Sequence, residues 1–138
     1  MEFRDLINNQ EAKRMKPDID LVQSLIKTSK QDLKFLESCK IDIYSARKVI
    51  SNYYDVLRSI LEAIACLDGF KIYSHEAFTF FLKQKQEFNF AEKFDRFRRI
   101  RNNINYYGRN IEIQEAIQLK QEIKDLIKIL SSKYLNNY

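Results

Sequence analysis

The chain has 138 residues, a length that fits one domain, and we predict a single domain over residues 1–138. Hydrophobic residues make up 45% of the sequence and aromatic residues 13%, which excludes a disordered chain because such chains lack the material for a core. The formal net charge of +5 permits an anionic partner such as nucleic acid but does not establish one.

Apolar residues recur at helical spacing along the chain, and nowhere do they alternate as in a strand. Only two glycines and one proline occur, which favours long helices over many turns. We predict helices over about these segments: Glu2 to Met15, Asp18 to Cys39, Asp42 to Asp68, His75 to Lys85, Phe90 to Gly108 and Glu112 to Lys133. The predicted architecture is all-α, an antiparallel bundle of four to five helices.

Several residues at the predicted helix ends are typical caps. Ser74 is suited to N-cap the short fourth helix, and Asn89 with Glu92 has the N-cap and N3 spacing of a capping box. Gly69 and Gly108 each follow a helix at the position where a left-handed backbone favours glycine.

The small numbers of cysteine and histidine residues exclude some classes of function. Cys39 and Cys66 are isolated and only one histidine occurs, so we expect no metal site and no cofactor. The segment from Met1 to Arg14 is charged and lacks the apolar core of a signal peptide, and no apolar run is long enough to span a membrane. We therefore expect a reduced, cytoplasmic protein that does not enter a membrane.

Arg101 interrupts an apolar stripe. In the predicted helix that starts near Phe90, apolar side chains share one face at these positions: Phe90, Phe94, Phe97, Ile104 and Tyr107. Arg101 falls on the same face, between Phe97 and Ile104. An unpaired buried charge is very costly, so we expect Arg101 to be paired with an acid or to point into a cavity or an interface.

Positive charge is concentrated around this arginine. The segment from Lys93 to Arg109 carries six basic residues and one acidic residue, a balance that equals the net charge of the chain. Because arginine forks match phosphate oxygens, we predict a surface that binds nucleic acid or nucleotide through Arg98, Arg101, Asn102, Asn105, Tyr107 and Arg109. The alternative interpretation is a solvated helix flank, which we favour for Arg96 and Arg99.

The tyrosine pair and the single histidine each have two interpretations. Tyr106 and Tyr107 are placed to stack on a base, but a tyrosine pair at a helix end is more typical of core packing. His75 has the chemistry of a general base, but at a helix start a capping or surface role is more typical. If the chain is an enzyme, the catalytic candidates are Arg101, Tyr106 and His75.

Three local features together resemble the HEPN domain, a small all-α family. A long helix rich in small residues and tyrosines, IYSARKVISNYYDVLRSILEA, spans Ile43 to Ala63. Ser74 and His75 then open a short helix, and the segment RNNINYYG, from Arg101 to Gly108, precedes a final amphipathic helix. The resemblance covers most of the chain from about Lys40 to Lys133 and implies a HEPN-like bundle.

The resemblance also implies a function. Active HEPN proteins are metal-independent endoribonucleases with an arginine followed four to six residues later by a histidine, and they dimerise so that both motifs line one cleft. Many pair with a nucleotidyltransferase, and some act as toxins in toxin–antitoxin systems. Arg101 and Asn102 match the start of the motif, whereas Tyr106 and Tyr107 stand where the histidine belongs.

The missing motif histidine predicts little or no cleavage, because a phenol with a pKa of about 10 is a poor general base at neutral pH. Our first hypothesis is a HEPN-like homodimer that binds nucleic acid or nucleotide without cleaving it, or that pairs with a nucleotidyltransferase. The second is an endoribonuclease that uses Arg101 with Tyr106, Tyr107 or His75. The third is a protein-interaction module in which Arg101 makes a structural ion pair.

Overall fold

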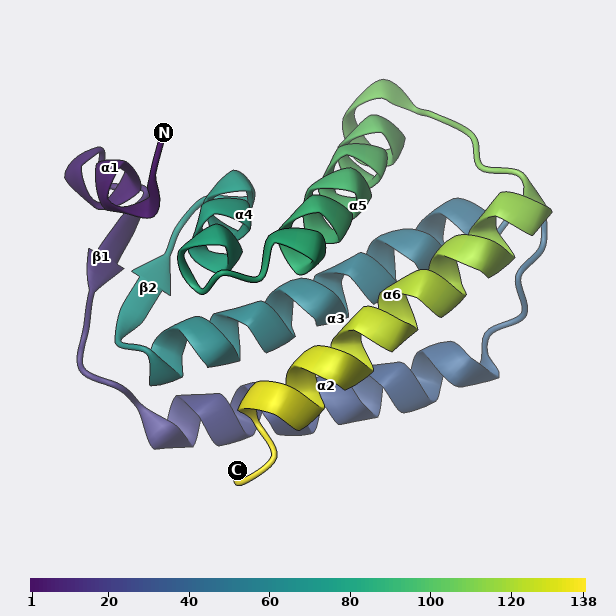
Figure 1. The fold of residues 1–138 in the computed structure, drawn as a ribbon. Coiled ribbons are helices and arrows are strands. Elements are labelled where there is room, and N and C mark those ends of the chain that lie inside the picture. The colour runs from purple at the N-terminus through teal and green to yellow at the C-terminus, as the bar shows by residue number, and fades with distance from the viewer.

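The computed structural model describes all 138 residues and contains six helices and two short strands (Figure 1). In chain order the elements are α1 (Phe3–Asn8), β1 (Ala12–Arg14), α2 (Ile19–Ser38), α3 (Ala46–Leu67), β2 (Phe70–Ile72), α4 (His75–Gln84), α5 (Phe88–Tyr107) and α6 (Ile113–Tyr134). The predicted all-α helical bundle is confirmed, since the two strands have only three residues each.

The helix α3 is the centre of the bundle. Of its 22 residues, 14 are buried, and it packs against α2, α5 and α6. Successive long helices reverse direction, so that α2 and α5 run opposite to α3 and α6 (Figure 1). A helix that is apolar on most of its circumference requires partners on several sides, and α3 therefore provides the surface on which α5 is placed.

The predicted helix from Glu2 to Met15 is wrong beyond its first two turns. The helix α1 ends at Asn8, and Gln10 has a φ of 64°, which a right-handed helix does not allow. The strand β1 follows and pairs antiparallel with β2, with Ala12 opposite Ile72. The prediction that strands are absent is therefore also wrong, because three-residue strands are too short to show an alternating pattern.

Two predicted glycine caps and one N-cap are confirmed. Gly69 and Gly108 follow α3 and α5 with φ values of 87° and 66°, in the left-handed region. The hydroxyl of Ser74 accepts a hydrogen bond from the backbone N–H of Ala77 at 3.2 Å and caps α4. This cap fixes the start of α4, where His75 is the first helical residue.

One predicted cap and one predicted helix start are wrong. The helix α5 begins at Phe88 with Glu87 as its cap residue, so Asn89 lies inside the helix and does not cap it. Asp42 starts a turn instead of α3, because its carboxylate accepts hydrogen bonds from the N–H groups of Tyr44 and Ser45. Aspartate commonly stabilises turns in this way, and the helix begins only when the turn is complete.

Candidate functional site

The apolar stripe of α5 is confirmed except at its last position. Phe94, Phe97 and Ile104 are buried in the core, whereas Tyr107 is 82% exposed. Tyr107 is the last residue of α5 and lies outside the core, so its assignment to the stripe is wrong. Arg101 occupies the stripe between the buried residues, on the face that α5 turns toward α3.

Arg101 is enclosed, yet it makes few polar contacts within the chain. Its side chain is 17% exposed, and its Nε is buried without a hydrogen-bond partner. Its nearest carboxylate oxygen is Oδ1 of Asp55, 3.6 Å from Nη2, which is an ion pair but too long for a hydrogen bond. The guanidinium lies against Tyr54, with Cζ 5.6 Å from the ring centroid, a cation–π arrangement.

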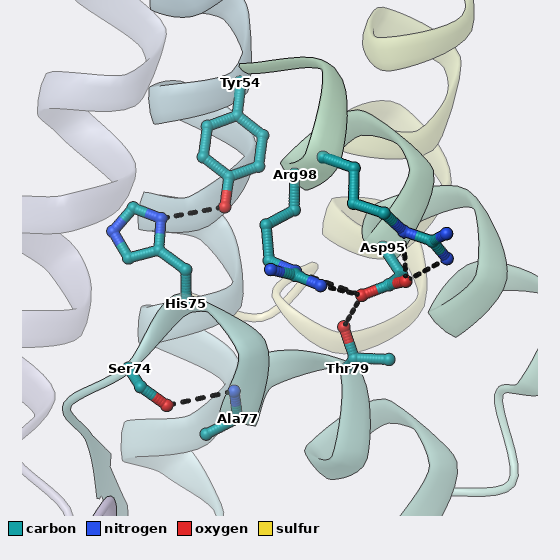
Figure 2. Close-up of polar contacts among 8 residues, drawn as sticks. Tyr54, Ser74, His75, Ala77, Thr79, Asp95 and Arg98 are labelled. Carbon is teal, nitrogen blue, oxygen red and sulfur yellow. Dashed lines mark hydrogen bonds and ion pairs between the residues drawn. The ribbon is translucent and has the colours of Figure 1, made fainter. Parts of the chain in front are cut away.

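Arg98, one turn earlier, is enclosed to the same degree but is hydrogen-bonded to a carboxylate. Its side chain is 16% exposed, and its Nε and Nη2 donate to Oδ1 of Asp95 at 3.0 and 2.8 Å. Arg99 binds the other oxygen of Asp95, and the hydroxyl of Thr79 in α4 donates to Oδ1 at 3.2 Å (Figure 2). The two arginines therefore differ in their acid contacts: Arg98 donates two short hydrogen bonds to Asp95, whereas Arg101 has only the 3.6 Å ion pair with Asp55.

The other predicted binding residues are spread along the second half of α5 and beyond it. Arg109 pairs with a glutamate of α6 at 2.7 Å, and Asn105 accepts a hydrogen bond from a serine of α3 at 3.1 Å. Asn102 is half-buried beside Arg101.

Tyr106 is 70% exposed, so like Tyr107 it lies in solvent at the C-terminal end of α5. The structure thus does not enclose the tyrosine pair with Arg101.

His75 binds Tyr54, whose ring also contacts Arg101, so two of the catalytic candidates named from the sequence share one neighbour. Its Nδ1 is 2.9 Å from the hydroxyl oxygen of Tyr54, and the two rings are stacked with centroids 5.7 Å apart (Figure 2). The expected capping or surface role is wrong, since Ser74 provides the cap and His75 is half-buried. Tyr54 joins the two groups, because its hydroxyl contacts His75 and its ring contacts Arg101.

Enclosure and positive charge keep His75 neutral. Burial and the charges of Arg58, Arg101 and Arg98 lower its pKa from 6.5 to about 4. Burial raises the pKa of Tyr54 well above its ordinary value, so the phenol keeps its proton and is able to donate it to Nδ1. When Nδ1 accepts this hydrogen bond, the imidazole carries its own hydrogen on Nε2, which is then free to donate to a ligand.

Cations outnumber carboxylates around Tyr54. Asp95 is shared by two arginines, and Glu62 is shared by Arg58 at 3.2 Å and Lys71 at 2.7 Å. Asp55 is the only acid that pairs with Arg101, and burial raises the pKa of Asp55 although the charges of Arg101, Arg58 and Lys48 oppose the shift. The charges that act on the Tyr54 phenol are those of Arg101, Arg98 and Arg58 against that of Asp55, a positive balance that suits an anionic ligand.

The arrangement offers donors and positive charge for an anion. The structure brings no three histidine, cysteine, aspartate or glutamate side chains close enough together to hold a metal ion. None of its helices has the length and apolar character needed to cross a membrane. Comparisons with protein-family models, with curated proteins and with solved structures find no match to this chain.

The environment of His75 predicts an unusual titration. Because His75 is the only histidine, its ring signals in an NMR titration are free of overlap. We expect a pKa of about 4, well below that of an exposed histidine. The unfolded chain binds this proton at higher pH than the folded chain, so folding stability should fall as the pH drops from about 6.5 to about 4. His75→Gln should reduce that loss of stability. A pKa of His75 between about 6 and 7 in the wild type would contradict the enclosure of its ring.

Proposed function

We propose that this chain is a HEPN-like helical protein that binds the phosphate group of a nucleotide or an RNA strand through Arg101 and does not cleave it. The observation that carries the proposal is the state of the guanidinium: it is largely enclosed, yet none of its N–H groups donates a hydrogen bond within the chain. A buried donor without a partner costs about 1–3 kcal/mol, and more when it is charged. A phosphate oxygen is a strong acceptor that fits the arginine fork and offsets this cost.

Two further observations support a phosphate ligand over a purely structural role. A structural ion pair of an enclosed arginine is expected to show short, forked contacts, as Arg98 shows with Asp95. Arg101 instead makes one loose contact with Asp55 and lies where cations exceed carboxylates. The resemblance of Arg101 and Asn102 to the start of the HEPN motif points to the same residue from the sequence.

A second candidate function is metal-independent cleavage of RNA, and the position of His75 favours it. The imidazole is close enough to Arg101 and Arg98 for their charges to lower its pKa. In such a reaction a base removes the proton of a 2′-hydroxyl, the 2′-oxygen attacks phosphorus, and the 5′-oxygen leaves and gains a proton. A histidine with a pKa of about 4 is a weak base at neutral pH, which is why binding without cleavage remains the first proposal.

Replacement of Arg101 tests the binding proposal. Arg101→Met removes the charge but keeps an apolar stem against Tyr54. A hydrogen bond to a charged group contributes about 1.5–3 kcal/mol, so affinity for a short single-stranded RNA should fall by about 10- to 100-fold. Fluorescence anisotropy with labelled RNA at low salt measures the change.

Arg99→Met is the matched control. It removes one charge from the same helix, but Arg99 is 69% exposed and is already paired with Asp95. We expect the affinity for RNA to change by about 3-fold or less, because an exposed charge acts on RNA mainly through a long-range electrostatic field that salt screens. Wild-type affinity should also decrease as salt increases. Equal losses in the two variants, or no RNA binding by the wild type at low salt, would contradict a specific role for Arg101.

Cleavage separates the two candidate functions. In EDTA, with labelled RNA, we expect no products from the wild type, from His75→Gln or from Tyr106→Phe. Metal-free cleavage that is lost in His75→Gln and in Arg101→Met would establish the second candidate and identify His75 as the base. Cleavage that is lost in Tyr106→Phe but not in His75→Gln would assign that role to the tyrosine instead.

We further propose that the chain forms a homodimer, as the HEPN resemblance implies. The support is a set of large exposed apolar side chains in the α2–α3 connection and at the end of α5: Ile43, Tyr44, Tyr106 and Tyr107. A second copy that covers these side chains would remove their apolar area from water. Light scattering at micromolar concentration should give twice the chain mass of 16.6 kDa. A monomer mass would contradict the homodimer and favour a different partner chain, such as a nucleotidyltransferase.

A further inference from the structure

A hollow between α2 and α3 borders the candidate site. Its volume is about 320 Å³, and it is lined by Asp32, Phe35 and Leu36 of α2 and by Asn52 and Asp55 of α3. The two helices lie side by side (Figure 1). Asp55 belongs both to this hollow and to the ion pair with Arg101, whose Nη2 is 3.6 Å from its carboxylate. The hollow and the arginine therefore adjoin.

The lining of the hollow combines an aromatic face with unengaged polar groups. Phe35 is 65% exposed although its neighbour Leu36 is only 2% exposed, so the aromatic ring lies at the rim of the hollow. No hydrogen bond within the chain involves the side chain of Asp32 or Asn52, and Asp55 makes only the loose ion pair. An aromatic face beside free polar side chains is the kind of surface on which nucleobases stack and pair.

We propose that this hollow seats the base of a nucleotide whose phosphate binds Arg101, an inference that rests on the phosphate-binding function proposed above. Phe35 stacks on the base, and Asp55 accepts hydrogen bonds from the sugar hydroxyls, as carboxylates do in dinucleotide sites. Because Asp55 and Arg101 are in contact, the sugar and the phosphate of one nucleotide reach both residues.

The polar lining favours guanine as the base. One edge of guanine carries two adjacent N–H donors and a carbonyl acceptor. The Asp32 carboxylate accepts from the two donors, and the amide of Asn52 donates to the carbonyl oxygen. A carboxylate and an amide that line one hollow complement this edge better than that of uracil, which has a single N–H donor between two carbonyl groups.

Two ligands, one with a base and one without, test the proposed base-binding hollow (the base seat) separately from the phosphate site at Arg101. Isothermal titration of wild type with GMP and with ribose 5-phosphate compares a ligand with a base against one without. We expect GMP to bind about 10-fold more tightly, since one stacked base corresponds to about 5- to 150-fold in affinity. Phe35→Ala should reduce GMP affinity to that of ribose 5-phosphate and leave ribose 5-phosphate unchanged.

Phe88→Ala is the matched control, because Phe88 is an equally exposed phenylalanine (59%) that lines a different hollow, beside α1 and α4. It should leave both affinities unchanged. Equal affinities of wild type for GMP and ribose 5-phosphate would overturn the base seat and leave the phosphate site standing. Absence of binding of both ligands at low salt would overturn the phosphate site itself.

The source of the nucleotide is resolved by adding a short RNA that ends in guanosine 5′-phosphate. If RNA and GMP bind equally and both weaken in Phe35→Ala, the ligand is a free nucleotide. If RNA binds more tightly and weakens by the same factor in Phe35→Ala, the seat holds one nucleotide of a strand. RNA binding that Phe35→Ala does not change would overturn the base seat for strands.

Discussion

The enclosed guanidinium of Arg101, whose Nε is buried without a hydrogen-bond partner, is the constraint on which the rest of the site depends. The apolar stripe of α5 places Arg101 against Tyr54, where little water reaches it, and the nearest acid is too far away for a hydrogen bond. The attraction between a positive charge in such a place and any anion is strong, because the local dielectric constant is low. A closer carboxylate would remove this property, as Asp95 does for Arg98.

Tyr54 connects this charge to the only histidine. It is completely buried, it stacks on Phe94 with centroids 5.6 Å apart, and its hydroxyl binds His75. A phosphate that neutralises Arg101 also removes part of the field that lowers the pKa of His75. If phosphate binds Arg101 as proposed, its binding and the protonation of His75 are coupled, with each favouring the other. The hydrogen bond from Tyr54 leaves the N–H of the neutral imidazole on Nε2, and the low pKa of His75 makes it a weak base toward a hydroxyl group.

Features that depend on local chemistry were predictable from the sequence. The stripe of Phe94, Phe97 and Ile104 follows from helical periodicity, and the Ser74 and Gly108 caps follow from the backbone groups that they satisfy. Periodicity also predicted that Arg101 interrupts this apolar stripe, which is why the residue could be selected from the sequence alone.

Features that depend on which helices cross could not be predicted in this way. Asp55 and Arg101 are 46 residues apart and His75 and Tyr54 are 21 apart, so no spacing rule relates them. The β1–β2 ribbon forms from two segments too short for a pattern. The hollow at Phe35 was equally hidden, because nothing in the sequence shows that Asn52 and Asp55 of α3 lie opposite this part of α2.

The most direct test of the account is the NMR signal of each arginine Nε–H during titration with inorganic phosphate. The account predicts that the Arg101 Nε–H shifts and saturates as phosphate binds, because this donor is buried without a partner in the free protein. The Arg98 and Arg99 signals should change little, since Asp95 already holds both side chains. Saturable shifts at Arg98 or Arg99 with none at Arg101 would contradict the account.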